Sequence, residues 1–223
     1  RGIAVVVCCG TFPSWNAYPS ILANLATGNP VVIKPHPNGI LPMAIAVQTA
    51  RALFSSLGFD PNLISLVADE QSNPRTIELI KHPETRIIDF TGSPEFGSWI
   101  EQNCRNALVY TETAGCNSVL LESTNDLDGC INAIAQSLCL FSAQMCTSAQ
   151  NIFMPADGIL VNGAQMPFDD VANKLVSTID HMTSNPKHAA ALCGAVMAQR
   201  TLDQIKCLER DYPEQILRRS TTY

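Results

Sequence analysis

The sequence has few histidines and few charged residues for its length. Of 223 residues, four are His and 15% are Asp, Glu, Lys or Arg. No His accompanies a pair of cysteines, so neither a zinc site nor another metal site is predicted. The 14 Lys and Arg residues are scattered and the net charge is −6. Because phosphate binding needs a basic footprint, nucleic acid is not an expected partner.

Long apolar runs and paired cysteine motifs are also missing. Without a run of about 18 apolar residues, no membrane span is expected. The nine cysteines are odd in number, two are adjacent, and none are spaced C-x-x-C. A disulfide framework is therefore not expected, and the simplest compartment is a reducing cytoplasm. Most of these thiols are predicted to be inert core groups.

Short apolar segments alternate with amphipathic ones along the chain. The segments predicted to be strands are 3–7, 29–35, 62–68, 86–93, 107–113, 117–123 and 150–155. The segments predicted to be helices are 41–58, 74–82, 94–104, 126–141 and 170–182. This order is typical of an α/β fold with open, mainly parallel sheets and helices on both faces. A domain boundary is expected near 114–117.

Two segments have features of a ligand-binding strand end. In "FTGSPEFG" a strand ends at Gly92 and Ser93 and a helix follows, and backbone N–H groups at such a junction attract phosphate. In "VVIKPHP" Lys34 closes an apolar strand, where a ribose hydroxyl or a phosphate often binds. An ordinary βα turn and a solvated lysine are the alternatives.

Two further segments place a polar side chain after a strand. Asn16 in "PSWNAYP" offers a neutral amide donor for an oxyanion, with a turn asparagine as the alternative. Glu112 in "YTETAGCN" is a candidate general base for water, with a surface glutamate as the alternative.

Cys146 is the candidate nucleophile. It lies in "FSAQMCTSAQNIFM", on an expected loop between a helix and a strand. No His is placed to suggest the partner that a cysteine protease or a glutaminase requires. An additional buried thiol is the alternative interpretation.

Together the five segments resemble the aldehyde dehydrogenase superfamily. The likeness covers about residues 3–210 and is carried by "SWNAYP", "LATGNPVVIKP", "FTGSPEFG", "ETAGCNSVLL" and "SAQMCTSAQNIFM", which are similar to the family's Trp-Asn, Gly-Asn-x-Val-Val-x-Lys-Pro, Phe-Thr-Gly-Ser-x-x-x-Gly, Glu-Leu-Gly-Gly and Gly-Gln-x-Cys motifs. "WNAYPSILANLATGNPVVIKPHP" is most similar to the bacterial phenylacetic acid degradation proteins of the PaaN type. The likeness also implies a fragment of a longer protein, with 1–114 part of the NAD(P)-binding Rossmann-like domain and 115–223 part of the catalytic domain.

The resemblance implies a role for each motif residue. Cys146 attacks an aldehyde, Asn16 and the Cys146 N–H hold the oxyanion, and Glu112 activates water to hydrolyse the thioester. The cofactor is NAD or NADP, which accepts hydride. Its binding residues are Lys34 at the ribose, Ser93 at the pyrophosphate, and Trp15, Pro37 and Gly92.

Departures from the family pattern keep alternatives open. Pro37 stands where the family often has a Glu that favours NAD, so NADP is plausible, with Lys34 and His36 as donors. Ala114-Gly115-Cys116 replaces the usual Gly-Gly-Lys. The expected function is oxidation of an aldehyde, possibly CoA-linked, in aerobic phenylacetic acid degradation (the ring-opening semialdehyde) by a cytoplasmic homo-oligomer. A CoA-acylating dehydrogenase and a non-catalytic nucleotide-binding relative are the alternatives.

Overall fold

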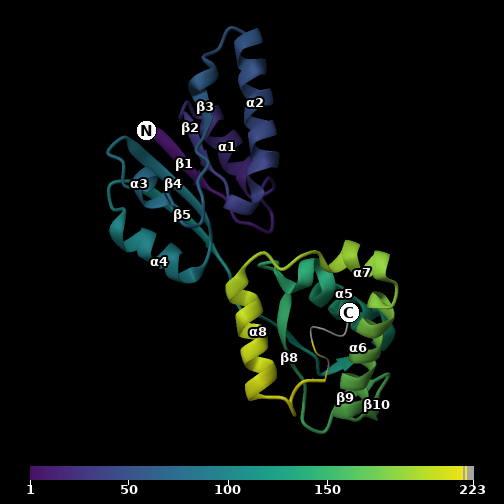
Figure 1. Ribbon diagram of the computed structural model, residues 1–223. Helices are drawn as coiled ribbons and strands as arrows, with labels where there is room; N and C mark the ends of the chain where they lie inside the picture. The colour runs from purple at the N-terminus through teal and green to yellow at the C-terminus, as the bar shows by residue number, and fades with distance from the viewer. Residues whose placement is uncertain (218, 220–223) are drawn as a thin grey trace. The chain divides into compact units, whose positions relative to one another are not determined.

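The computed structural model describes residues 1–217 and 219, so positions 218 and 220–223 of the predicted domain 115–223 lie outside it. The chain divides into two compact units, residues 1–114 and 115–223, each with its own core. In order, unit 1 contains β1 (Ile3–Val7), α1 (Ala17–Ala26), β2 (Val31–Lys34), η1 (Pro37–Gly39), α2 (Ile40–Ser56), η2 (Pro61–Leu63), β3 (Ile64–Leu66), α3 (Thr76–Ile80), β4 (Thr85–Gly92), α4 (Pro94–Asn103) and β5 (Leu108–Thr113) (Figure 1).

Unit 1 is a five-stranded sheet covered on both faces. The strand order is β3-β2-β1-β4-β5, and every neighbouring pair is parallel. Successive β1 side chains point to opposite faces. Val6 therefore packs in one cluster with Ile21 of α1 and Met43 of α2. Val5 packs in a second cluster with Ile100 of α4 and with a buried residue of α3. The predicted α/β fold is confirmed.

The order of the strands reverses at β1. The chain moves from β1 to β2 and β3 on one side, and then returns to β4 and β5 on the other. In open parallel sheets, ligands bind beyond the carboxyl ends of the strands at such a reversal. The segments that follow β1 and β4 are therefore the first place to look for a site in unit 1.

Unit 2 contains two small sheets, one of two strands and one of three, together with several helices. It contains β6 (Asn117–Leu120), β7 (Ser123–Thr124), α5 (Leu127–Cys139), η3 (Leu140–Ala143), β8 (Ala149–Phe153), β9 (Ile159–Val161), β10 (Ala164–Met166), α6 (Phe168–Thr183), α7 (Pro186–Cys193) and α8 (Gln199–Asp211). Strands β6 and β8 pair in parallel, and β7, β9 and β10 form a second sheet. Ile131 of α5, Ile159 of β9 and Val171 of α6 share the core.

Several element boundaries differ from the sequence-based expectation. The helix predicted over 126–141 ends at Cys139, because Phe141, Ser142 and Ala143 all have positive φ. Helix α1 was not predicted, although Pro19 in its first turn is well tolerated there. The β9–β10 hairpin was also not predicted.

The hairpin had a clear signal in the sequence. Asn162 and Gly163 join β9 to β10 with φ values of 50° and 81°. Asn-Gly between two short apolar segments is the strongest short-range indication of a tight hairpin turn, since both central residues must adopt positive φ.

Candidate active site

Most of the predicted site residues in unit 1 belong to the carboxyl edge of its sheet. Lys34 ends β2, Gly92 ends β4, Glu112 lies near the end of β5, and Asn16 follows β1. Because the strands are parallel, these ends lie along one edge. Residues separated by up to about a hundred positions are therefore brought to the same side of unit 1.

Asn16 occupies the N-cap position of helix α1, but its side chain does not cap the helix. Its backbone has helical angles (φ −69°, ψ −23°), and its side chain makes no capping hydrogen bond. Its backbone N–H donates to the Phe12 carbonyl at 3.4 Å. The neighbouring Trp15 side chain is 71% exposed. The amide of Asn16 is thus not committed to the helix terminus, which leaves its N–H groups free to serve as donors.

Lys34 is a buried member of an ion pair. Its Nζ lies 2.8 Å from Asp69 Oδ1, with the two side chains only 5% and 1% exposed. The same ammonium donates to the Pro35 carbonyl at 2.7 Å. The other carboxylate oxygen of Asp69 accepts from the Arg75 backbone N–H at 2.8 Å. The solvated lysine that was the alternative interpretation is therefore wrong.

His36 and Pro37 lie in the turn that follows Lys34. Burial and the nearby Lys34 ammonium lower the pKa of His36, so the ring is neutral at physiological pH. Its Nδ1 accepts from the Asn38 backbone N–H at 3.2 Å. A Cβ on Gly10 would lie 3.2 Å from the His36 ring, so the ring packs closely over the segment after β1. Pro37 is the first residue of η1 and carries no charge.

Gly92 and Ser93 form the junction between β4 and α4. Ser93 is the N-cap of this ten-residue helix, and its hydroxyl accepts from the Phe96 backbone N–H at 3.3 Å. A Cβ on Gly97 would lie 2.6 Å from a methyl of Thr113. Gly97 thus lets α4 pack tightly against the end of β5. The exposed turn and the positive end of the helix dipole suit an anionic group.

Glu112 is exposed on β5 and has a second carboxylate nearby. Asp89 lies on the adjacent strand β4, two residues before Thr91, which pairs with Glu112. The pKa of Asp89 is raised chiefly by burial and further by Glu112, while a hydrogen bond from Ser20 opposes the shift. Asp89 was not among the candidate residues predicted from the sequence. A carboxylate inside an apolar strand was the signal, since such a group is costly to bury.

Cys146 lies in unit 2 on the loop between η3 and β8 and is exposed. Its carbonyl accepts a hydrogen bond from the Asn117 side chain. Ser148 donates its backbone N–H to the Met145 carbonyl at 3.1 Å, which closes a turn around Cys146. The thiol is therefore presented by a loop whose backbone is fixed on either side of it.

Gln144 fixes the same loop from the other direction. Its side chain donates to the Ala195 carbonyl at 2.9 Å and accepts from the Met197 backbone N–H at 2.8 Å. Ser142 donates to the Cys193 carbonyl at 2.8 Å. These bonds hold the left-handed backbone of residues 141–143 in place. Such strained segments are characteristic of functional loops.

Three other cysteines are chemically quiet. Cys8, Cys104 and Cys139 are buried, and burial raises the pKa of each thiol, that of Cys8 to about 12. A protonated, inaccessible thiol is a poor nucleophile. Cys146 differs from all three because it is exposed.

Asn16 and Glu112 belong to unit 1 and Cys146 to unit 2.

Asp69 is the second residue of the site that was not predicted from the sequence. It follows the short strand β3, and its only sequence signal was an acidic residue shortly after an apolar segment.

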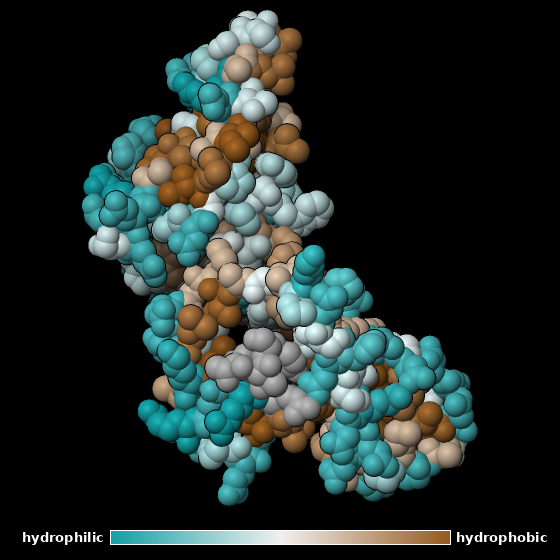
Figure 2. All heavy atoms as spheres, turned by 45° about the vertical axis from the view of Figure 1, so that its right-hand side comes forward, coloured by the Kyte–Doolittle hydropathy of each residue, from teal (hydrophilic) through white to brown (hydrophobic). Residues whose placement is uncertain are grey.

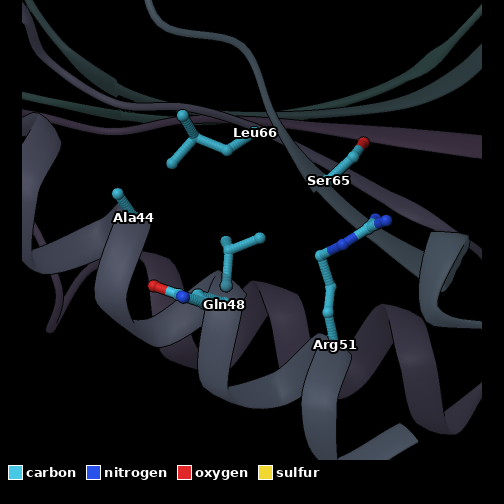
Figure 3. A pocket seen from close by; sticks show the side chains of 6 residues that line it. Ala44, Gln48, Arg51, Ser65 and Leu66 are labelled. Atoms are coloured by element: carbon cyan, nitrogen blue, oxygen red, sulfur yellow. The ribbon is translucent and has the colours of Figure 1, made fainter. Parts of the chain in front are cut away.

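One pocket lies between α2 and β3, and none of these residues lines it. It is lined by Ala44, Val47, Gln48, Arg51, Ser65 and Leu66 (Figure 3). The Arg51 guanidinium there is bound to the carbonyls of Pro61 and Ile64 at 3.0 Å. In residues 1–217 and 219 no group of three or more His, Cys, Asp or Glu could hold a metal ion. Nor does any helix in that part of the chain have the length and apolarity to cross a membrane.

Residues 2–215 match the aldehyde dehydrogenase family. An NAD-dependent aldehyde dehydrogenase from Burkholderia multivorans has a similar crystal structure, with a TM-score of 0.89 and 42% identity over 94% of this chain and 38% of that one. N-succinylglutamate 5-semialdehyde dehydrogenase from Burkholderia cenocepacia is 26% identical over 90% of this chain and 40% of its own length.

The fold is shared more widely. An NADP-dependent glyceraldehyde-3-phosphate dehydrogenase from Bacillus halodurans, solved with NADP, has a TM-score of 0.75 at 24% identity over 96% of this chain and 42% of that one. The chain thus spans about 40% of the length of these three relatives.

Proposed function

We propose, because this chain belongs to the aldehyde dehydrogenase family, that the whole protein oxidises an aldehyde to a carboxylic acid with NAD or NADP. The observation that carries the proposal is the exposed Cys146 on an anchored loop. The buried thiols at 8, 104 and 139 have raised pKa values and are unsuited to attack. Covalent catalysis divides the oxidation into acylation and deacylation, which are each easier than a single step.

Acylation begins when the Cys146 thiolate adds to the aldehyde carbon. The carbonyl oxygen becomes an oxyanion, which the Asn16 amide and the Cys146 backbone N–H stabilise. Asn16 suits this role because its side chain does not cap α1. A bound nicotinamide would supply the acceptor for the hydride that leaves the same carbon. Cys146 then carries a thioester.

Deacylation requires water at the thioester carbon. Glu112 accepts a proton from this water, which attacks and releases the carboxylic acid and the Cys146 thiolate. Glu112 is exposed, so water reaches it, and the partly buried Asp89 nearby adds negative charge to its surroundings.

The residues at the carboxyl edge of unit 1 fit a dinucleotide. The turn at Gly92 and Ser93 leads into a ten-residue helix whose positive end suits a pyrophosphate. Lys34 lies on the next strand but one, with Pro37 following it, and the exposed Trp15 lies after β1. We assign these residues to cofactor binding. The NAD-dependent relative at 42% identity and the NADP-bound relative of the same fold support the two cofactors.

The substrate proposal is a small aldehyde, and its finer form is the ring-opening semialdehyde of aerobic phenylacetic acid degradation, as in the PaaN type. Its support is the likeness of residues 15–37. Two of the three relatives described above are named for other aldehydes, N-succinylglutamate 5-semialdehyde and glyceraldehyde-3-phosphate. The test below therefore decides the substrate. Glu112 favours hydrolysis over transfer of the acyl group to CoA.

Assembly and compartment are part of the same proposal. Large apolar side chains are exposed on α2, including Leu41 and Leu53, and apolar surface is visible in Figure 2. Leu120 and Phe153, which pair across β6 and β8, are exposed as well. These surfaces support a homo-oligomer, which light scattering on the full-length protein would test. Nine free thiols suit a reducing cytoplasm.

The test uses the full-length protein, an aldehyde panel that includes aromatic and CoA-linked semialdehydes, and each dinucleotide in turn. Reduced nicotinamide is followed by absorbance, with and without CoA. Cys146→Ser should abolish turnover, whereas Cys207→Ser, which alters another exposed thiol on α8, should leave it unchanged. Glu112→Gln should leave a thioester on Cys146 that mass spectrometry detects.

Each outcome discriminates among the alternatives. Turnover by Cys146→Ser at the parent rate would refute the covalent mechanism. Activity that requires CoA, with an acyl-CoA product, would indicate the acylating dehydrogenase. Dinucleotide binding without oxidation of any aldehyde would indicate a non-catalytic relative.

A further inference from the structure

We propose that Asp69 is a specificity-determining residue, which makes this protein prefer NAD over NADP by neutralising Lys34. The inference rests on the proposed function, because it requires a dinucleotide at the carboxyl edge of unit 1. The two cofactors differ by one phosphate on the adenosine ribose. Discrimination therefore depends on whether an uncompensated cation is available where that phosphate lies.

The positive charge of Lys34 is compensated by the carboxylate of Asp69. Its ammonium lies 2.8 Å from Asp69 and 2.7 Å from the Pro35 carbonyl, with the lysine side chain 5% exposed. Asp69 is held in turn by the Arg75 backbone N–H at 2.8 Å. At most one N–H of Lys34 remains for a ligand, which suits a neutral ribose hydroxyl better than a phosphate dianion.

Strand pairing explains why the two residues meet. β2 and β3 are parallel neighbours, with Ile33 opposite Leu66. Lys34 therefore ends one strand beside the segment that leaves the next, and Asp69 lies in that segment. The pairing continues one step further, because the Val67 N–H donates to the Ile33 carbonyl at 2.9 Å. Asp69 thus supplies, from the segment after β3, the carboxylate that Pro37 does not.

The other cations of unit 1, all within the described residues, do not replace Lys34. Arg75 pairs with Glu78 at 2.7 Å, and Lys81 lies 5.0 Å from the Trp99 ring centre. Arg51 is bound to backbone carbonyls beyond α2. The three remaining arginines, at 1, 86 and 105, line a pocket with the first residue of β5, at the amino edge.

His36 does not provide a positive charge either. It follows Lys34 closely, but its ring is neutral at physiological pH for the reasons given above. The Nδ1 atom accepts a backbone N–H, so the ring proton sits on Nε2. A single neutral N–H donor is compatible with a ribose hydroxyl and adds little attraction for a phosphate dianion.

The experiment measures equilibrium binding of NAD and NADP to the full-length protein by calorimetry, without aldehyde. The wild-type protein should bind NAD at least about tenfold more tightly than NADP. Asp69→Asn keeps the shape and uncovers the Lys34 charge. It should tighten NADP binding about tenfold and change NAD binding little.

Two controls isolate the charge. Asp60→Asn makes the same chemical change at a carboxylate that also accepts a backbone N–H, 2.8 Å from Asn62, but forms no ion pair with a cation of the described residues. It should leave the ratio of the two dissociation constants unchanged. The double variant Lys34→Met with Asp69→Leu removes both charges, and should keep the preference for NAD.

Three results would overturn the inference. These are a wild-type protein that binds NADP as tightly as NAD, a folded Asp69→Asn protein with an unchanged ratio, and a double variant that gains NADP affinity. Thermal melting reports whether each variant folds. If Asp69→Asn does not fold, the wild-type ratio and the double variant still decide. If the wild-type protein binds neither dinucleotide, the proposed function itself fails, which is a separate result.

Discussion

Gly158 is the glycine whose replacement should damage unit 2 most. Its φ is +101°, a conformation that residues with a side chain rarely adopt. A Cβ there would overlap the Met166 carbonyl oxygen and lie 2.8 Å from the Met166 carbonyl carbon and from the Phe168 backbone nitrogen. All three atoms belong to the backbone that joins β10 to α6, so no side-chain rotation can relieve the overlap.

The size of the effect follows from two contributions. A positive φ costs a non-glycine residue about 1–2 kcal/mol. Displacing the backbone between β10 and α6 adds to this, so we expect Gly158→Ala to cost about 3–5 kcal/mol. Gly163→Ala has φ +81° but open space around the new Cβ, so it should cost only about 1 kcal/mol. Gly115→Ala has neither problem and should be nearly neutral.

Native-state hydrogen exchange of the full-length protein is the assay. It gives the opening free energy of the segment that contains β9, β10 and α6 in each variant. The order of destabilisation should be Gly158→Ala, then Gly163→Ala, then Gly115→Ala. Equal losses at 158 and 163 would show that backbone conformation alone matters and that a Cβ at 158 does not overlap the Met166 backbone.

Other predictions concern the Cys146 loop and a buried thiol. Gln144→Ala should raise amide exchange over 142–147 and lower kcat/KM by about 10- to 100-fold, because the loop loses its anchors at Ala195 and Met197; unchanged exchange would contradict this. Ala143→Gly should stabilise the fold by up to about 1 kcal/mol in urea denaturation, because φ is +56° there. Burial raises the pKa of Cys8 from about 9 to about 12 in the folded protein. The contribution of the protonated thiol to folding stability is therefore complete below pH 9 and is lost as the pH rises toward 12, because the unfolded chain ionises first. Cys8→Ala should remove that part of the pH dependence, measured as denaturation midpoints from pH 8 to 11.

Much of unit 1 could be predicted from local sequence. Apolar segments of four to eight residues between turn signals identified the strands, and Pro94 after Ser93 marked the start of a helix. The end of α5 could not be predicted in this way. Its apolar periodicity continues to Phe141, but the backbone turns left-handed there because Gln144 and Ser142 are held by the segment 193–197.

The sequence by itself determined which residues stand at strand ends and in which order, because apolar periodicity and turn residues are local properties. It therefore indicated Asn16, Lys34, Ser93, Glu112 and Cys146 as candidates, and the family that their order resembles. Only the tertiary structure decided what each one contacts. Lys34 seemed to be an available cation because Asp69 lies in a different segment, and nothing local connects the two. Their contact exists because β2 and β3 pair in parallel, which brings together ends that are far apart in the chain.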